Sequence, residues 1–419
     1  MKNERITDTL ETDVLIAGAG MAGYAAAIGA AEAGNQVILI EKHNTPGGAA
    51  TLSNVGTLCG LYYRGPHSIP VPHPLCTWLV KKLTQTYPDS KVLSMPEGLH
   101  VLAYNKIHLT DILRRHLSGR SIQTTFGVEV TGVQIENQKL TAVTFMKEGH
   151  QRTIHSKTFI DCTGTGALAA QAQHPMLQSR AYQAAAQIIR FENVKATTEY
   201  ALNFSLRKVM RETQEQQNWP TAYLRLSIVP GSLRDDSFDL KLPLTETITD
   251  NDTLADRLKL EVEKNLPQLV HAMRKIESLA QTSVAEIAPL PGVRLQQRPQ
   301  GQYILTHMDV MQCTKPEDGI AIGTWPIEEW GYDGKVNMEY FAEADGYLIP
   351  ARCLQSSIFQ NLYFAGKGIS ADDKAIASAR VTGTCLQTGY AAGKLAACDN
   401  AREKEDIIST LHTTLIPKP

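Results

Sequence analysis

A buried-strand pattern near the N-terminus breaks into regularly spaced glycines and continues as an alanine-rich helix. The apolar run before Gly18 is followed by Gly20 and Gly23, and a second apolar run ends at Glu41. Continuous apolar runs bounded by turn residues are typical of buried parallel strands, and the alanine-rich segment between them favours a helix. The pattern therefore predicts a strand–helix–strand unit over roughly residues 10–41.

Each glycine of this unit has a role in a dinucleotide-binding turn. Gly18 permits the tight turn, Gly20 lets the backbone approach a pyrophosphate, and Gly23 lets the helix pack closely on the strand. The helix N-terminus then offers unpaired N–H groups to the phosphates. Glu41 follows about 20 residues later, where a carboxylate holds a ribose hydroxyl. We therefore expect the chain to bind a dinucleotide.

The rest of the chain alternates between α/β and α+β patterns. Residues 61–105 form an excursion, and the pattern predicts a hairpin of residues 128–135 and 140–145. A strand before Gly164 and another before Gly366 resemble the first strand in composition. Because these strands lie far apart in sequence, we expect one discontinuous domain with an insertion. The predicted units are 1–175, 176–345 and 346–419, and the further predicted elements are strands over 222–228 and 287–293 and a long helix over 378–397.

Composition narrows the class of protein. The chain has 419 residues, with 41 Lys and Arg against 43 Asp and Glu, so its formal net charge is −2. This balance argues against a nucleic-acid surface. We expect no signal peptide, no integral membrane segment and, from seven scattered cysteines, a cytoplasmic location. His67, His73 and Cys76 fit no standard metal spacing, so no metal is expected.

Three separated elements carry a resemblance to a known fold. The glycine pattern with Glu41 and Gly47-Gly48, the strand ending Asp161-Cys-Thr-Gly164, and the strand ending Ala365-Gly366 resemble the FAD-binding fold of glutathione-reductase-like flavoproteins. The C-terminal third is similar to bacterial FAD-dependent oxidoreductases related to fumarate reductase and L-aspartate oxidase. The stretches that carry this similarity are Pro291-Gly-Val-Arg294, Ile349-Pro-Ala-Arg-Cys-Leu354, Asn361 to Ala371 and Ser378 to Gly393.

The resemblance implies a Rossmann-type FAD-binding domain, discontinuous in sequence, with an inserted α+β cap that chooses the substrate. It implies FAD as the cofactor; non-covalent binding is favoured over a covalent link, and the sequence leaves this choice open. A second glycine fingerprint is not evident, so NAD(P)H is left open as an external donor only. The residues implied in cofactor binding, beyond Gly18, Gly20, Gly23 and Glu41, are Met21, Ala22, Lys42, Gly48, Ala49, Val130, Thr163, Gly164, Gly366, Arg380 and Thr382.

Four residues are candidates for contact with the substrate. Arg294 and Arg298 suit a carboxylate, because guanidinium binds carboxylates through two hydrogen bonds; the alternative is a salt bridge between domains. Glu328 is a candidate general base, or a solvated loop carboxylate, and the nearby tryptophans Trp325 and Trp330 would raise its pKa. Cys59 is a candidate catalytic thiol, against the simpler interpretation as a buried small side chain.

These residues suit hydride transfer between a small carboxylate- or amine-bearing substrate and N5 of the flavin. A flavin monooxygenase that uses NAD(P)H and O2 is the alternative hypothesis, and a flavoprotein with a structural FAD is the third. The sequence leaves the substrate, the direction of the reaction, the electron partner and oligomerisation open.

Overall fold

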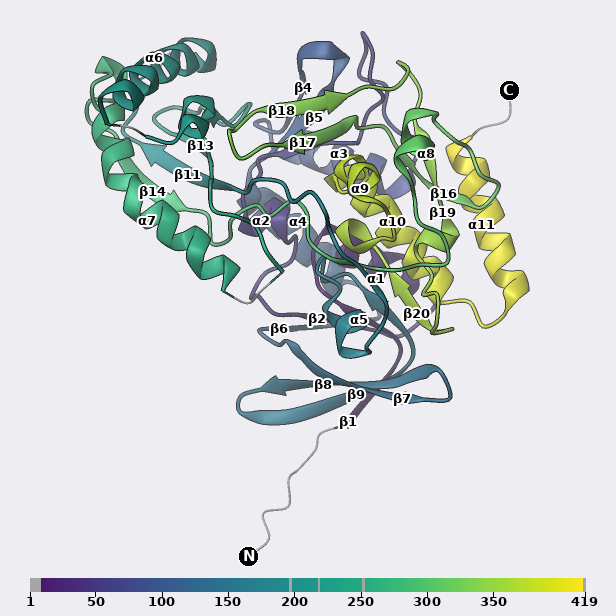
Figure 1. The fold of residues 1–419 in the computed structure, drawn as a ribbon. Helices are drawn as coiled ribbons and strands as arrows, with labels where there is room; N and C mark the ends of the chain where they lie inside the picture. The colour runs from purple at the N-terminus through teal and green to yellow at the C-terminus, as the bar shows by residue number, and fades with distance from the viewer. Residues whose placement is uncertain (1–8, 196–197, 218, 251–252, 417–419) are drawn as a thin grey trace, which may run out of the picture.

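The computed structural model describes residues 9–195, 198–217, 219–250 and 253–416. Within this part of the chain, the main sheet has seven strands and lies at the lower end of the molecule in Figure 1. The three strands predicted before Gly18, Gly164 and Gly366 lie in this one sheet, since the middle one, over residues 150–161, pairs in parallel with both the first and the last. The order is β6 (Ile122–Phe126), β2 (Val37–Glu41), β1 (Thr9–Ala17), β9 (His150–Asp161), β8 (Lys139–Lys147) and β7 (Val130–Glu136), with β20 (Leu362–Phe364) also on β9.

The α/β class and the parallel sheet are therefore confirmed. The predicted hairpin is the antiparallel pair β7–β8, which continues onto the first half of β9. The second half of β9 pairs with β20 instead, through Phe159, Ile160 and Asp161. One long strand thus joins the parallel part of the sheet to the antiparallel part.

Two helices beside this sheet pack on each other with almost no side-chain spacer. A Cβ at Gly389 would lie 2.1 Å from the carbonyl oxygen of Ala22, and one at Gly393 would lie 2.1 Å from that of Ala26. Glycine at these positions lets the helix backbones touch, which explains the small residues of both helices. They are α1 (Met21–Glu32) and α10 (Thr382–Ala396).

The excursion between β2 and β6 forms a separate layer beside α10. It contains the short helix α2 (Ala49–Leu52), β3 (Thr57–Leu58), α3 (Pro74–Thr86), β4 (Lys91–Ser94), the 3-10 helix η1 (Pro96–Gly98), β5 (His100–Ala103) and α4 (Lys106–Ser118). Its three strands form a small antiparallel sheet, and α3 and α4 pack against the core of the main sheet.

A second sheet, with its own core, lies between β9 and β20 in sequence. One face carries Ile189, Phe191, Leu240 and Leu242, which pack beneath the two long helices at the upper left of Figure 1. The other face carries charged residues at alternating positions, since side chains of a strand alternate between faces. The sheet order is β12 (Ser227–Ile228), β13 (Phe238–Pro243), β11 (Ala186–Glu192) and β14 (Ser283–Ile287), and the helices are α6 (Glu199–Gln217), η2 (Thr221–Arg225), α7 (Leu254–Met273) and η3 (Glu277–Leu279).

The remaining elements return to the core of the main sheet. Buried residues between Leu295 and Leu354 pack with α1 and α10 rather than with α6 and α7. The unit boundaries at 175/176 and 345/346 stay predictions. The elements are α5 (Ala167–Gln171), β10 (Met176–Leu177), β15 (Arg298–Pro299), α8 (His307–Met311), β16 (Gly319–Gly323), β17 (Ile327–Trp330), β18 (Val336–Glu339), β19 (Tyr347–Pro350), η4 (Ala351–Cys353), η5 (Gly366–Gly368), α9 (Asp373–Ala379) and α11 (Ala401–Leu415).

Three predicted elements differ from the structure. The helix predicted over 378–397 is two helices, α9 and α10, which break at Arg380 and Val381 because Val381 is extended with ψ of 156°. The strand predicted over 222–228 is mostly the 3-10 helix η2. The strand predicted over 287–293 ends where it was expected to begin, at Ile287 of β14.

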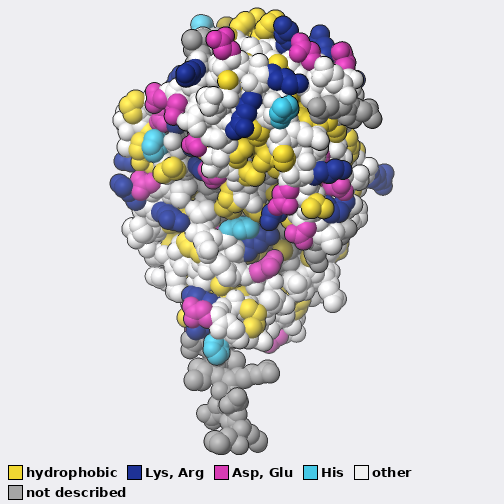
Figure 2. Space-filling view, turned by 90° about the vertical axis from the view of Figure 1, so that its left-hand side faces the viewer, with side chains coloured by type: hydrophobic (Ala, Val, Ile, Leu, Met, Phe, Trp, Pro, Cys, Tyr) yellow, Lys and Arg dark blue, Asp and Glu magenta, His cyan; other side chains and the backbone are white. Residues whose placement is uncertain are grey.

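The surface on the α6 and α7 side carries hydrophobic side chains in its upper half, among blue and magenta charges (Figure 2). Exposed large hydrophobic residues of these helices include Tyr200, Phe204 and Leu260. Neither sign of charge dominates this face. Among the described residues, no helix is long and apolar enough to span a bilayer.

Candidate active site

The glycines of the first turn are required by backbone packing. Gly18 has φ of +95° and donates its N–H to the carbonyl oxygen of Ile40 at 2.8 Å. A Cβ there would lie 2.6 Å from the carbonyl oxygen of Cys162, and a Cβ at Gly23 would lie 1.7 Å from that of Gly18. The turn between β1 and α1 therefore accepts glycine alone at these two positions.

Glu41 ties this turn to the end of β2. Its carboxylate accepts the N–H of Ala19 at 2.6 Å and that of His43 at 2.9 Å. The Glu41 carbonyl oxygen accepts the N–H of Val128 at 3.0 Å, two residues before Val130. A carboxylate offers about four acceptor positions, so two remain on Glu41 for a further donor such as a ribose hydroxyl.

The two later segments reach the same turn. Asp161, at the end of β9, accepts the N–H of Thr163 at 3.0 Å and its hydroxyl at 2.7 Å, which shapes the turn through Gly164. Gly366 has φ of +68°, and a Cβ there would lie 2.6 Å from the Cβ of Ala22. The structure thus brings together predicted cofactor residues from three distant parts of the chain.

The space around this turn suits a dinucleotide. Gly20 is open, since a Cβ there would meet only the Gly48 Cα, at 4.0 Å. Thr384, in the first turn of α10, has a buried hydroxyl with no partner among the described residues. Lys367 donates to the Val293 carbonyl and the Gln296 side-chain oxygen, both at 3.3 Å. Burial, and then the charge of Arg380, lowers the pKa of Lys367 to about 8. A buried cation held by neutral oxygens and an unpartnered hydroxyl fit a ligand with phosphates and ring carbonyls.

The remaining predicted cofactor residues border the same turns. Met21 and Ala22 begin α1, and Gly48 precedes Ala49 at the start of α2, with φ of +54°. Lys42 is exposed directly after β2. Arg380 and Thr382 flank the break between α9 and α10. Their individual roles stay predictions.

A carboxylate held by two indoles marks a second cluster. Glu328, on β17, accepts the indole N–H of Trp325 and that of Trp330, each at 2.8 Å. The carboxylate of its neighbour Glu329 accepts a long hydrogen bond from the side-chain amide of Asn337, at 3.4 Å. The two indoles fix both carboxylate oxygens of Glu328, which a solvated loop carboxylate would not show.

Three cations surround this carboxylate. The Arg380 guanidinium donates to the backbone carbonyl of Glu328 at 3.0 Å. The Arg294 guanidinium lies 4.3 Å, and the Lys241 ammonium 4.0 Å, from the ring centre of Trp330. Cations over an indole face are stabilised by the ring quadrupole. We call this group of side chains the Glu328 cluster. Its members are Glu328, Trp325, Trp330, Lys241, Arg294 and Arg380.

The charges of the Glu328 cluster do not balance. The carboxylate that acts on all three cations is Glu328. Burial, and then the charge of Arg294, lowers the pKa of Lys241 to about 8. Burial, and then the charge of Arg380, lowers the pKa of Arg294 to about 9. Three cations against one carboxylate leave the cluster with a positive excess, which an anionic ligand would relieve.

The expected rise in the pKa of Glu328 is wrong. Burial against the indoles does raise it, but the charge of Arg380 and the hydrogen bond from Trp325 outweigh burial and lower the pKa of this carboxyl. Glu328 is therefore ionised at neutral pH and able to accept a proton.

Cys59 lies beside the Glu328 cluster, and its carbonyl oxygen accepts the N–H of Gly383 at 2.8 Å. Burial, and then the charge of Glu328, raises the pKa of the Cys59 thiol to about 12. A neutral thiol is a poor nucleophile. Burial and the raised pKa thus favour the simpler interpretation, that Cys59 is a buried packing residue. A catalytic role for Cys59 stays a prediction.

The surroundings of Arg298 differ from those of Arg294. It is 2% exposed, and it donates to the Ala371 carbonyl at 3.0 Å, the Ser179 hydroxyl at 2.9 Å and Asp373 at 2.7 Å. These bonds match the salt-bridge alternative for Arg298. Its proposed contact with substrate stays a prediction.

Sequence reasoning missed Lys241, Lys367 and Gln183. Gln183 accepts from Arg380 and from the Trp330 backbone, both at 3.3 Å. The signal for Lys241 was present as a charged residue between the apolar Leu240 and Leu242 of β13. The sequence did not show that the face of the sheet that carries Lys241 is the one that turns toward Trp330.

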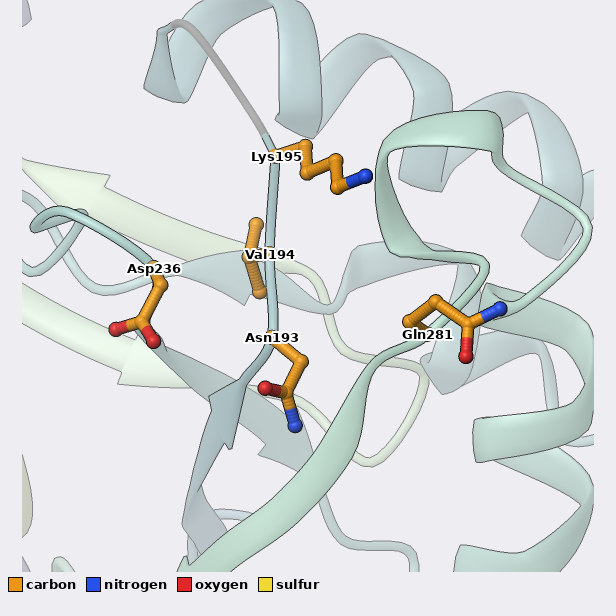
Figure 3. A pocket seen from close by; sticks show the side chains of 5 residues that line it. All are labelled: Asn193, Val194, Lys195, Asp236 and Gln281. Atoms are coloured by element: carbon orange, nitrogen blue, oxygen red, sulfur yellow. The ribbon is translucent and has the colours of Figure 1, made fainter.

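A hollow of about 520 Å³ lies at the other end of β11 from Gln183. Figure 3 shows the side chains that line it, on the segment after β11 and the loops facing it. None of the predicted site residues lines it. Its lining residues are Asn193, Val194, Lys195, Asp236 and Gln281.

The chain is similar in sequence and in fold to known proteins. A model of the family described as FAD dependent oxidoreductase matches residues 13–412. A hydroxyneurosporene desaturase of Rhodobacter capsulatus is 48% identical over 65 residues, 16% of this chain and 13% of that protein. A urocanate reductase of Eggerthella lenta is 56% identical over 45 residues, 11% of this chain and 7% of that protein. These similarities thus span a small part of either relative. In fold, the chain is similar to OxyS anhydrotetracycline hydroxylase from Streptomyces rimosus, with a TM-score of 0.50 and 10% identity over 96% of this chain and 65% of that one.

Proposed function

Because this chain belongs to the family of FAD-dependent oxidoreductases, we propose that it transfers hydride between FAD and a small molecule that carries a carboxylate. The observation that supports the substrate class is the positive excess of the Glu328 cluster. Lys241, Arg294 and Arg380 face one ionised carboxylate. Buried charges are costly without partners, so an anionic substrate would stabilise the cluster when it binds.

The residues divide the work by position. The turn after β1 and Glu41 would hold FAD, which would supply the hydride-transfer chemistry when bound. Arg294 binds the substrate carboxylate, and Lys241, which also lies against the Trp330 ring, adds a second charge-assisted bond. Glu328 accepts the proton that leaves the substrate, since its oxygens are fixed by the two indoles. Trp330 covers the substrate and limits access of water.

Substitution of Arg294 tests the proposal. We expect Arg294→Ala to keep its bound FAD, measured by absorbance, and to lose affinity for carboxylate substrates by about tenfold or more, because one charge-assisted bond is removed. The assay follows anaerobic bleaching of the flavin by a panel of carboxylates and the matching amides. Arg352→Ala is the control, since Arg352 pairs with Asp318 at the surface with its side chain 49% exposed.

Three outcomes would contradict the proposal. Amides that bleach the flavin as well as carboxylates would remove the substrate class. Oxygen uptake driven by NAD(P)H and coupled to product would favour a monooxygenase instead. A bound flavin that nothing reduces would favour a structural FAD. The finer relation to fumarate reductase and L-aspartate oxidase, the cytoplasmic location and oligomerisation stay predictions.

A further inference from the structure

Five polar side chains form a row across the contact between the second sheet and the excursion. This contact lies at the loop after α2 and at the start of α4 (Figure 1). Three members of the row belong to the sheet and stand directly opposite one another on neighbouring strands, so they share one face. It is the charged face that also carries Lys241. In order, the members are Asn54, Asp239, Arg190, Glu286 and Lys106.

Asp239 stands at the buried end of this row. It is 5% exposed, and its carboxylate accepts two hydrogen bonds from the Arg190 guanidinium, at 2.8 and 3.1 Å. The buried side-chain amide of Asn54 donates to the same carboxylate at 3.2 Å. At the other end, Lys106 pairs with Glu286, whose side chain is 39% exposed, and exposed ion pairs contribute little. The Asp239 end therefore decides how the sheet is held.

The loop that carries Asn54 fits closely against the second sheet. Asn54 has φ of +47°, a conformation that asparagine adopts more readily than most residues. A Cβ at Gly56 would lie 2.4 Å from the Cγ1 of Val229, directly after β12. The N–H of Leu290 donates to the carbonyl oxygen of Leu52 at 3.1 Å. The loop is thus shaped to bring Asn54 to Asp239.

We propose that Asp239 is a positioning residue: held by Asn54, it fixes the charged face of the second sheet so that Lys241 lies against Trp330. Lys241 follows Asp239 by two residues on the same face of β13, about 7 Å along the strand. Its ammonium lies 4.0 Å from the ring centre of Trp330, which belongs to β17, outside this sheet. A small movement of the sheet would therefore take Lys241 away from Trp330. The effect on substrate rests on the function proposed above, whereas the position of Lys241 does not.

Variants of Asn54 test this role in the FAD-loaded protein. Asn54→Gly removes the donor to Asp239, adds no charge and suits the positive φ of this position. Asn54→Asp sets a second carboxylate against Asp239, so the contact should open further. The exchanged variant, Asn54→Asp/Asp239→Asn, restores one donor and one acceptor and should close the contact again. Asn193→Gly is the matched control, because Asn193 is an exposed asparagine with φ of 60° that bonds Ser283 of the same sheet.

The pKa of Lys241 reports a change in its position and needs no substrate. It is measured by trace labelling of amines with acetic anhydride at a series of pH values, followed by mass spectrometry. In the wild type this ammonium faces Arg294, Glu328 and Cys59, and burial, with the charge of Arg294, lowers its pKa to about 8. We expect this pKa to rise toward 10.5 in both single variants of Asn54, to return in the exchanged variant and to stay unchanged in the control.

Kinetics test whether the contact acts through Lys241. Asn54→Gly should raise the KM for carboxylates about threefold to tenfold, with kcat within about twofold, because binding alone is weakened. In the Lys241→Met protein the same change should leave KM where it is. Carboxylates that do not reduce the flavin would overturn the proposed function, and the labelling would still decide the position of Lys241. The positioning role is overturned if Asn54→Gly keeps the wild-type pKa of Lys241, or if the exchanged variant does not restore it.

Discussion

The turn after β1 and the charged face of the second sheet suit two different kinds of ligand recognition. The turn uses backbone: Gly18 and Gly23 leave no room for a side chain, and the space beside the Cα of Gly20 is open. The second sheet uses side chains, of which Lys241 on β13 extends toward Trp330 of β17. Backbone recognition leaves a local mark in the sequence, whereas side-chain recognition is assembled from distant strands.

The two sheets also differ in how far their faces are buried. Val14 to Ala17 of β1 are at most 1% exposed, because helices and strands cover both faces of the main sheet. In β13, Leu240 and Leu242 are fully buried, but Lys241 between them is half-buried beside Arg294 and Trp330. The main sheet is therefore packed on both faces, whereas the second sheet is packed on one face and carries the charged residues of the proposed site on the other.

The largest effect on flavin binding and stability is expected in the turn after β1, where backbone atoms are in direct contact. Gly23→Ala places a methyl group 1.7 Å from the Gly18 carbonyl oxygen, so the turn must open. We expect loss of bound FAD and a fall of about 3 kcal/mol in the free energy of unfolding. Flavin absorbance and urea unfolding measure both. Gly119→Ala is the control, since its nearest neighbour would be 3.9 Å away. Normal flavin content in Gly23→Ala would contradict this account of the turn.

The next effect is expected on chemistry. Glu328→Gln removes the charge that accepts the proton but keeps the shape between Trp325 and Trp330. Turnover should fall about 100-fold with flavin content unchanged, the range for loss of a general base. Stopped-flow reduction of the flavin measures the step. Glu329→Gln is the matched control, and equal rates in the two variants would exclude Glu328 as the base.

Arg298 should separate stability from activity. Arg298→Gln breaks a buried ion pair with Asp373, so the free energy of unfolding should fall by about 2 kcal/mol. Turnover per bound FAD should stay within about twofold, because its hydrogen bonds go to protein groups. Arg352→Gln, at an exposed pair, should cost less than about 0.5 kcal/mol. A loss of substrate affinity in Arg298→Gln would return Arg298 to the substrate site.

The smallest effect depends on pH. The pKa of Lys241 is about 8, below its ordinary value of 10.5, so this ammonium loses its proton as pH rises through 8. Substrate affinity should therefore fall about tenfold above pH 8, and Lys241→Met should show the weak affinity at every pH.

Stability should follow the opposite course. Between pH 8 and 10.5 the unfolded chain binds this proton and the folded protein does not, so the free energy of unfolding rises with pH in that window. Lys241→Met should show a smaller rise in urea titrations, because Lys367 and Arg294, whose pKa values are also lowered, keep their own contributions. A wild-type affinity that is constant from pH 7 to 10 would show that Lys241 does not contact the substrate.

The sequence was sufficient for the elements whose signals are local. Gly18, Gly23 and Glu41 predicted the turn, and the strands ending at Asp161 and Phe364 join β1 in one sheet. Prediction failed where long-range contacts decide. The break at Val381 lies in a continuous run of helix-forming residues, and the pKa of Glu328 depends on Arg380, 52 residues away in sequence.

The sequence by itself determined the parallel sheet, the dinucleotide turn and the family, because glycine spacing and apolar runs act over a few residues. Only the tertiary structure decided which arginine is buried in a salt bridge and which lies over Trp330. It also placed Lys241 and Glu328 together. Charge and hydrogen bonding depend on neighbours in space, and those neighbours come from strands and helices that the chain brings together only when it folds.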